Sequence, residues 1–225
     1  MKVVAVIPAY NEEKRIKHTI VGVLRYTPHV VVVDDGSQDQ THREARAAGA
    51  QVVRHAVNRG QGAALKTGTM VALSQDADVV VHLDADGQHD PQSLPDVLMP
   101  IETDEADVVF GSRYLGMKPE GMPWTRRWVH RAGRLFNRYL LGVPHEITDA
   151  QSGLRAMRAE AAHAIDFMND GMAHCSEILR LVTRSDLRWA EVPVCVRYTE
   201  ETLAKGQKAS NAFKIVWQLF LRSFR

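Results

Sequence analysis

The sequence predicts an α/β fold in which a mostly parallel central sheet lies between helices. Apolar strand-like runs recur along the chain and alternate with stretches of helical pattern, an order typical of strand–helix–strand units. In two of these runs, Val31–Val33 and Val79–Val81, every residue is apolar and β-branched, as in strands covered on both faces. The chain has 225 residues, 45% hydrophobic and 24% charged, which suffices for one substantial core.

The predicted elements follow one another in a regular order. Strands are expected at Val3–Ile7, Val30–Val33, Gln51–Val53, Val79–Leu83, Asp107–Phe110 and Glu191–Val196. Helices are expected at Glu12–Arg25, Gln40–Ala48, Gly62–Leu73 and Gln92–Ile101, and near Cys175–Arg184. Pro91 fits the first turn of a helix, because its fixed φ and missing N–H are tolerated there. Residues 1–210 are therefore expected to form one domain.

The C-terminal segment at residues 211–225 has the pattern of an amphipathic helix. Phe213, Trp217 and Phe220 recur at helical spacing beside basic residues. This pattern is typical of a helix that lies in a membrane interface. A helix packed on the domain, or in a homo-oligomer, is the alternative. The sequence favours the interfacial helix.

Composition and motifs exclude several classes of protein. The net charge of +1 provides no basic field for nucleic acid. No leader opens the chain and no apolar run approaches the ~20 residues that span a bilayer, which predicts a cytoplasmic protein. Cys175 and Cys195 lie among apolar residues and are expected to be free thiols. The turn Pro8-Ala9-Tyr10-Asn11 lacks the glycines of a dinucleotide-binding turn, and Gly60-Gln61-Gly62 lacks the end of a P-loop.

Two carboxylates follow the strand at Val79–Leu83. Side chains in a strand repeat with period two, so Asp84 and Asp86 would point the same way if the extended conformation persists. Gly87 then lets the backbone turn. Hard oxygen ligands at the carboxyl edge of a sheet suit Mg²⁺ or Mn²⁺ shared with substrate phosphates. An Asp-rich turn that satisfies loop amides is the alternative.

Further motifs accompany this pair along the chain. They are Val4-Ala5-Val6-Ile7-Pro8-Ala9-Tyr10-Asn11-Glu12-Glu13, Val31-Val32-Val33-Asp34-Asp35-Gly36-Ser37-Gln38-Asp39, Asn58-Arg59-Gly60-Gln61-Gly62, Gly111-Ser112-Arg113-Tyr114 and Thr148-Asp149-Ala150-Gln151-Ser152-Gly153-Leu154-Arg155. In this order they resemble the family 2 glycosyltransferases, which have the GT-A fold and use nucleotide-activated sugars. The chain is most similar to the polyprenyl-phosphate hexosyltransferases of the dolichyl-phosphate mannose and glucose synthase group. The resemblance runs from Lys2 to about Ser210.

The resemblance implies a nucleotide-sugar site and a metal site. It places the nucleotide sugar on Pro8, Ala9, Tyr10, Asn11, Glu12, Asp34, Asp35, Gly62, Asp84 and Ala85. It places Mg²⁺ or Mn²⁺ on Asp84, Asp86 and Gln88, and it assigns catalytic roles to Asp84, Asp86, Asp149 and Arg113. Helix capping is the alternative for Asn11 and Glu12, and a turn role is the alternative for Gln88.

The acceptor is expected to be anionic. A lipid phosphate, with a second pKa of ~6, needs cations and no general base. The resemblance implies acceptor-phosphate contacts at Arg113, Arg126, Arg127, Arg131 and Lys208. For any one arginine of the stretch, a solvated helix face is the alternative. Many relatives instead use a carboxylate near the position of Asp149 as the general base for an acceptor hydroxyl.

These features predict inverting, metal-dependent transfer of a hexose from GDP-mannose or UDP-glucose to a polyprenyl phosphate. The enzyme is expected at the cytoplasmic face of the membrane, peripherally attached, with a homo-oligomer or a membrane-protein partner left open. Two alternatives stay open. One is transfer to a sugar hydroxyl in polysaccharide assembly, and the other is a non-catalytic subunit that binds nucleotide sugars.

Overall fold

The computed structural model describes residues 1–115 and 147–196. The predictions for Arg126, Arg127, Arg131 and Lys208, and for a helix at residues 211–225, lie outside the described residues. In the part of the chain that is described, no helix has the length and apolar character needed to cross a bilayer.

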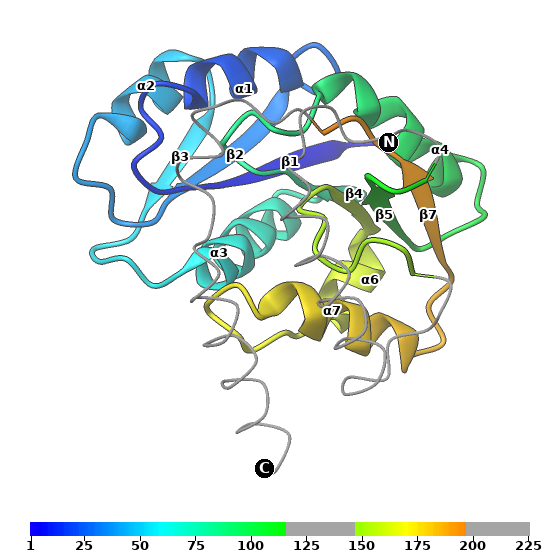
Figure 1. The fold of residues 1–225 in the computed structure, drawn as a ribbon. Helices are drawn as coiled ribbons and strands as arrows, with labels where there is room; N and C mark the ends of the chain where they lie inside the picture. The colour runs from blue at the N-terminus through cyan, green and yellow to red at the C-terminus, as the bar shows by residue number, and fades with distance from the viewer. Residues whose placement is uncertain (116–146, 197–225) are drawn as a thin grey trace.

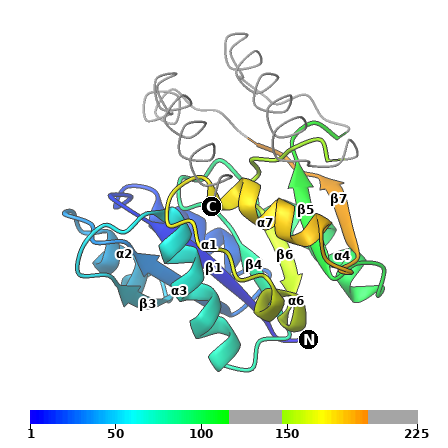
Figure 2. The ribbon, with the colours of Figure 1, turned by 90° about the horizontal axis from the view of Figure 1, so that it is seen from below.

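One seven-stranded sheet forms the centre of the molecule, in the order β3-β2-β1-β4-β6-β5-β7. The strands are β1 (Val3–Ala9), β2 (His29–Asp34), β3 (Gln51–Arg54), β4 (Val79–His82), β5 (Val108–Ser112), β6 (Arg155–Arg158) and β7 (Trp189–Pro193). β1 pairs in parallel with β2 and β4, β2 with β3, and β5 with β7. β6 runs antiparallel to β4 and β5 (Figure 2). The expected mostly parallel sheet is confirmed.

Helices cover both faces of this sheet (Figure 1). One face carries α1 (Ile16–Val23), α2 (Thr41–Ala47) and α4 (Leu94–Glu102), and the other carries α3 (Gln61–Ser74), α6 (Ala159–Ala164) and α7 (His174–Thr183). Alternate residues of β1 enter two separate cores: Ala5 and Ile7 pack with α1 and α4, whereas Val4 and Val6 pack with α3. Burial on both faces explains the unbroken apolar runs of the strands.

The structure differs from the sequence prediction at β6 and α6, which were not predicted. β6 consists of Arg155-Ala156-Met157-Arg158, with a charged residue at each end, and therefore gives no apolar run. Its place between β4 and β5 follows from long-range pairing, which local pattern does not report.

Two helices differ at their starts from the sequence prediction. Asn11 has a φ of 54°, in the left-handed region, so the chain turns through Glu12 before α1 begins at Ile16. The helix expected from Gln92 starts as a 3₁₀ turn at Pro91–Ser93 and continues as α4. Pro91 occupies the first turn, as predicted.

Candidate active site

Segments far apart in sequence meet at one edge of the sheet. β1, β2 and β4 are parallel and end there. Tyr10 and Asp35 directly follow β1 and β2, and Asp84 lies two residues after the end of β4. β5 ends at Ser112, and the loop at residues 147–154 returns to this edge because β6 runs the opposite way. Ligand sites of open α/β sheets form at this carboxyl edge.

Asp84 and Asp86 lie in a turn just beyond β4. The strand ends at His82, so the extended conformation does not reach these carboxylates. Asp84 Oδ1 accepts a hydrogen bond from Nε2 of Gln61 at 2.7 Å, and Asp86 Oδ1 accepts one from the backbone amide of Gln88 at 2.9 Å. Both carboxylates are therefore oriented by neighbours, one of which starts α3.

The negative charges of Asp84 and Asp86 influence one another. Burial, followed by the negative charge of Asp84, raises the pKa of Asp86 to about 7. Within residues 1–115 and 147–196, no group of three or more His, Cys, Asp or Glu side chains could hold a metal on its own. Mg²⁺ commonly binds through one or two carboxylates together with substrate phosphates, and Asp84 and Asp86 fit that mode.

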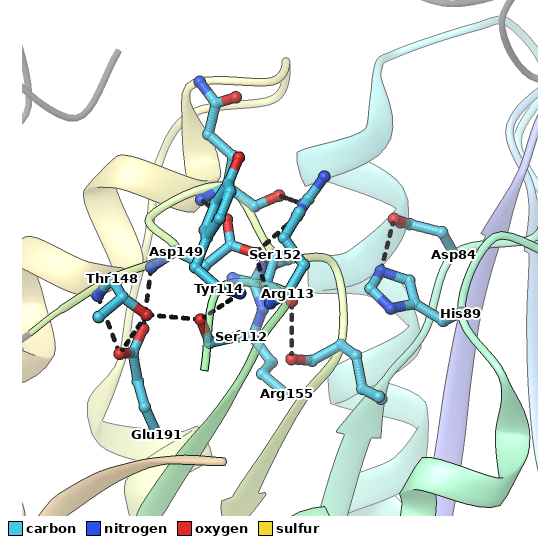
Figure 3. A network of polar contacts seen from close by, with 12 residues as sticks. Asp84, His89, Ser112, Arg113, Tyr114, Thr148, Asp149, Ser152, Arg155 and Glu191 are labelled. Carbon is cyan, nitrogen blue, oxygen red and sulfur yellow. Dashed lines mark hydrogen bonds and ion pairs between the residues drawn. The ribbon is translucent and has the colours of Figure 1, made fainter. Parts of the chain in front are cut away.

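The loop before β6 packs directly on Asp84. A Cβ atom on Gly153 would lie 2.0 Å from Asp84 Oδ2, so this position accepts only glycine without a shift of the carboxylate. The same oxygen, Asp84 Oδ2, lies 3.7 Å from Nε2 of His89 (Figure 3). Burial is the main cause that lowers the pKa of His89, so this side chain is neutral beside the carboxylate.

Arg113 and Asp149 form a buried ion pair at the end of β5 (Figure 3). Nε of Arg113 donates to Asp149 Oδ2 at 2.6 Å, and the backbone amide of Arg113 donates to the same oxygen at 3.2 Å. The exposed fractions of Arg113 and Asp149 are 8% and 3%. Arg113 also donates to the carbonyl of Gln151 at 3.3 Å. Asp149 is thus engaged as the counter-ion of Arg113.

Glu191 on β7 holds the backbone that carries Asp149. The sequence predicted only that Glu191 lies in a strand. Its carboxylate accepts hydrogen bonds from the amide of Thr148 at 2.8 Å and from the amide of Asp149 at 3.0 Å. Burial is the largest cause that raises the pKa of Glu191, against the effect of these hydrogen bonds. The available signal was one carboxylate in the otherwise apolar run Trp189–Pro193.

Asp34 and Asp35 lie at the predicted edge but are engaged by nearby loops. Asp34 is fully buried, accepts from the amide of Ser37 at 2.9 Å and lies 3.0 Å from Nε of Arg54. Asp35 is 3% exposed and accepts from the amide of Gly60 at 2.7 Å. These bonds fix the loop after β2 and the loop before α3.

His55 and Arg59 complete the surroundings of Asp35. Asp35 Oδ1 lies 2.7 Å from Nδ1 of His55 and accepts from the amide of Arg59 at 2.9 Å. Nε2 of His55 lies 3.0 Å from Oγ1 of Thr67 on α3. Asp35 thereby joins the end of β2 to α3, and contact with a nucleotide base stays a prediction.

The remaining predicted donor residues lie along β1 and the start of α3. Pro8 and Ala9 are buried in β1, Tyr10 is exposed, and Asn11 Oδ1 accepts from the amide of Gln38 at 2.9 Å. The carboxylate of Glu12 lies 2.7 Å from the guanidinium of Arg15.

Gly62 allows a close approach of backbones. A Cβ atom there would lie 2.0 Å from the carbonyl oxygen of Asn169, and Ala63 donates its amide to the carbonyl of Asp170 at 3.2 Å. Ala85 is buried, and its carbonyl accepts from Oγ1 of Thr19 at 3.2 Å. These contacts are structural, and nucleotide contacts at these positions stay predictions.

Comparison with known proteins identifies the family. A family model described as glycosyl transferase family 2 matches residues 4–166. This chain belongs to glycosyl transferase family 2. Its fold is GT-A, since the solved structure of glucosyl-3-phosphoglycerate synthase from Mycobacterium tuberculosis, in complex with Mn²⁺, UDP-glucose and phosphoglyceric acid, superposes with a TM-score of 0.75. The two sequences are 22% identical, and the superposition covers 97% of this chain and 77% of the synthase chain.

Curated relatives from prokaryotes are more similar in sequence. The UDP-N-acetylglucosamine–dolichyl-phosphate N-acetylglucosaminyltransferase of Methanococcus voltae is 34% identical, over 96% of this chain and 94% of the relative. The undecaprenyl-phosphate mannosyltransferase of Micrococcus luteus is also 34% identical, over 86% and 83%. The predicted family and glycosyltransferase activity are confirmed. The individual site residues stay predictions.

Proposed function

We propose that this glycosyltransferase transfers a hexose, with inversion, from GDP-mannose or UDP-glucose to a polyprenyl phosphate at the cytoplasmic face of the membrane. The observation that carries the acceptor class is the Arg113–Asp149 pair, because the carboxylate at the position that many relatives use as a base is here the counter-ion of an arginine. An anionic acceptor needs no base. The relatives named for dolichyl or undecaprenyl phosphate support the same class.

The donor half of the reaction requires stabilisation of a leaving diphosphate. Asp84 and Asp86, with Gln88 beside them, would hold Mg²⁺ or Mn²⁺, which when bound supplies Lewis-acid stabilisation of that charge. The hydrogen bond from Gln61 and the close packing of Gly153 hold the Asp84 carboxylate in place. Such pre-organisation lets the site stabilise charge without rearranging during the reaction.

The acceptor half requires a fixed cation next to the donor. Asp149 and Glu191 hold Arg113 in one orientation, and a guanidinium in fixed geometry binds phosphate oxygens well. We place further phosphate contacts at Arg126, Arg127 and Arg131 and at Lys208. Residues 1–210 are the proposed catalytic domain and residues 211–225 the proposed interfacial helix.

Transfer assays with a panel of donors test this proposal. With Mn²⁺ present, radiolabelled sugar from GDP-mannose or UDP-glucose is expected to pass to a short-chain prenyl phosphate and not to an alkyl glycoside. UDP-N-acetylglucosamine belongs in the panel because one relative is named for it. Efficient transfer to the glycoside, with none to the prenyl phosphate, would refute the lipid acceptor.

Removal of the segment after Ser210 is expected to weaken sedimentation with anionic liposomes and to spare hydrolysis of the nucleotide sugar. The apolar stripe would bury at the headgroup boundary, while Lys214, Arg222 and Arg225 add attraction to anionic lipid. A helix packed on the domain would instead give a lower melting temperature with unchanged sedimentation, and that result would remove the interfacial helix.

A further inference from the structure

A polar cluster lies buried beneath the candidate active site. Arg155, at the start of β6, is 1% exposed, and its guanidinium donates to the carbonyl of Ser152 at 3.0 Å and to Sγ of Cys175 at 3.3 Å. Nε2 of His174 lies 3.4 Å from the same sulfur, and Nδ1 of His174 lies 2.8 Å from the carbonyl of Gly171. The cluster joins α7 to the loop that carries Asp149.

Among the described residues, no carboxylate balances the charge of Arg155. Within residues 1–115 and 147–196, Arg155 forms no ion pair with an Asp or Glu side chain, and its Nε has no hydrogen-bond partner. A buried guanidinium is costly unless an anion faces it. In the part of the chain that the structure describes, the acidic group that contacts an amino nitrogen of Arg155 is the thiol of Cys175.

The position of one proton decides whether this anion exists. Nδ1 of His174 faces the carbonyl of Gly171 and carries hydrogen there. Nε2 therefore either accepts a hydrogen bond from the neutral thiol or, after the proton has moved to the imidazole, donates one to the thiolate. The total charge of the cluster is the same in both arrangements. The guanidinium of Arg155 favours the second, because it stabilises negative charge on sulfur.

We propose that Cys175 is a thiolate in the folded enzyme and acts as the counter-ion of Arg155, which in turn positions the loop between Asp149 and Leu154. The contact of Arg155 with the Ser152 carbonyl carries this effect to the active site. Gly153, next in the chain, packs on Asp84, and Asp149 pairs with Arg113. Cys175 is therefore a positioning residue, which touches neither donor nor acceptor.

The groups that face Cys175 agree with this assignment. They are the guanidinium of Arg155 on β6 and the imidazole of His174 on α7. Burial opposes the thiolate, but His174 and then Arg155 outweigh it and lower the pKa of Cys175 to about 6. Burial also opposes the charged imidazole, but the negative charge of Cys175 and its hydrogen bond outweigh burial and raise the pKa of His174. Glu177, further along α7, is engaged with the amides of Met168 and Asn169.

The chain offers a direct test, since Cys175 and Cys195 are its two cysteines. In the Cys195→Ser enzyme, ultraviolet thiolate absorbance reports Cys175 alone. We expect that absorbance to appear with a midpoint near 6, in place of the ordinary 9.0. A midpoint near 9 would overturn the proposal, whatever acceptor the enzyme uses.

A pair of substitutions tests the link to catalysis. Cys175→Ser keeps a polar group and loses the charge, so kcat is expected to fall on the order of tenfold to a hundredfold as the loop shifts, with the KM for donor little changed. Cys175→Asp restores a negative charge and is expected to recover much of kcat. If Cys175→Ser instead keeps the wild-type kcat and Cys175→Asp does not, Cys175 has a packing role and is not the counter-ion of Arg155. If Cys175→Asp does not fold, the Cys195→Ser titration decides alone.

Discussion

Replacement of Asp86 by alanine is expected to reduce sugar transfer by on the order of 10³-fold while the fold is retained. Asp86 lies in a turn after β4, and its Oδ1 accepts a hydrogen bond from the backbone amide of Gln88. Its loss removes one of the two carboxylates proposed to hold the cation that faces the leaving diphosphate. Metal-dependent transfer at fixed donor and Mn²⁺ concentrations measures the effect.

A matched control distinguishes this loss from a general effect of removing an acidic residue. Asp96 is exposed in the first turn of α4, so Asp96→Ala is expected to retain activity. Mn²⁺ together with nucleotide sugar is expected to raise the melting temperature of the wild type and of Asp96→Ala, and to raise that of Asp86→Ala much less. A folded Asp86→Ala enzyme with full activity would refute the metal site.

The pH dependence of stability of the metal-free protein tests the environment of Asp86 independently. Because the pKa of Asp86 is raised from 3.8 to about 7, the folded state holds this proton more tightly than the unfolded state between those values. Stability without divalent cation should therefore fall as pH rises from about 4 to about 7. Asp86→Asn keeps the shape without the charge and is expected to flatten this decline. Denaturant unfolding at a series of pH values measures this decline. An equal decline in the wild type and in Asp86→Asn would contradict a raised pKa of Asp86.

Local sequence pattern predicted the strands whose apolar character comes from burial on both faces, and the polar turns that follow them. β6 escaped prediction because two arginines bound it, and one of them, Arg155, is buried with Cys175 and not exposed. Glu191 escaped because its partners, Thr148 and Asp149, lie more than forty residues away in the chain. Side chains that satisfy one another over such distances leave no periodicity in the sequence.

The pairing of Arg113 with Asp149 also changes what a single substitution at either residue can show. Sequence reasoning treated the two as separate, one a phosphate contact and the other a candidate base. In the structure, Nε of Arg113 and Oδ2 of Asp149 are 2.6 Å apart and both residues are buried. Removing one partner of such a pair typically destabilises a protein by about 3–5 kcal/mol, since the other charge is left uncompensated. A loss of activity in a single variant therefore mixes stability with substrate binding.

Arg113→Ala is expected to raise the KM for prenyl phosphate by about tenfold to a hundredfold, because one or two charge-assisted hydrogen bonds to the acceptor are lost. The KM for nucleotide sugar is expected to rise much less.

The double variant Arg113→Ala/Asp149→Ala serves as the control. It removes both charges, so it is expected to regain stability relative to Arg113→Ala. If Arg113 binds the acceptor, the KM for prenyl phosphate stays high in the double variant, because no cation has been restored. If Arg113 only supports the loop, the KM returns toward the wild-type value together with the melting temperature. An equal rise in both KM values would place Arg113 at the donor diphosphate.

Asp149→Asn tests the carboxylate by itself. Loss of transfer to a lipid phosphate, with unchanged stability and unchanged acceptor KM, would assign Asp149 a role in the chemistry beyond that of a counter-ion.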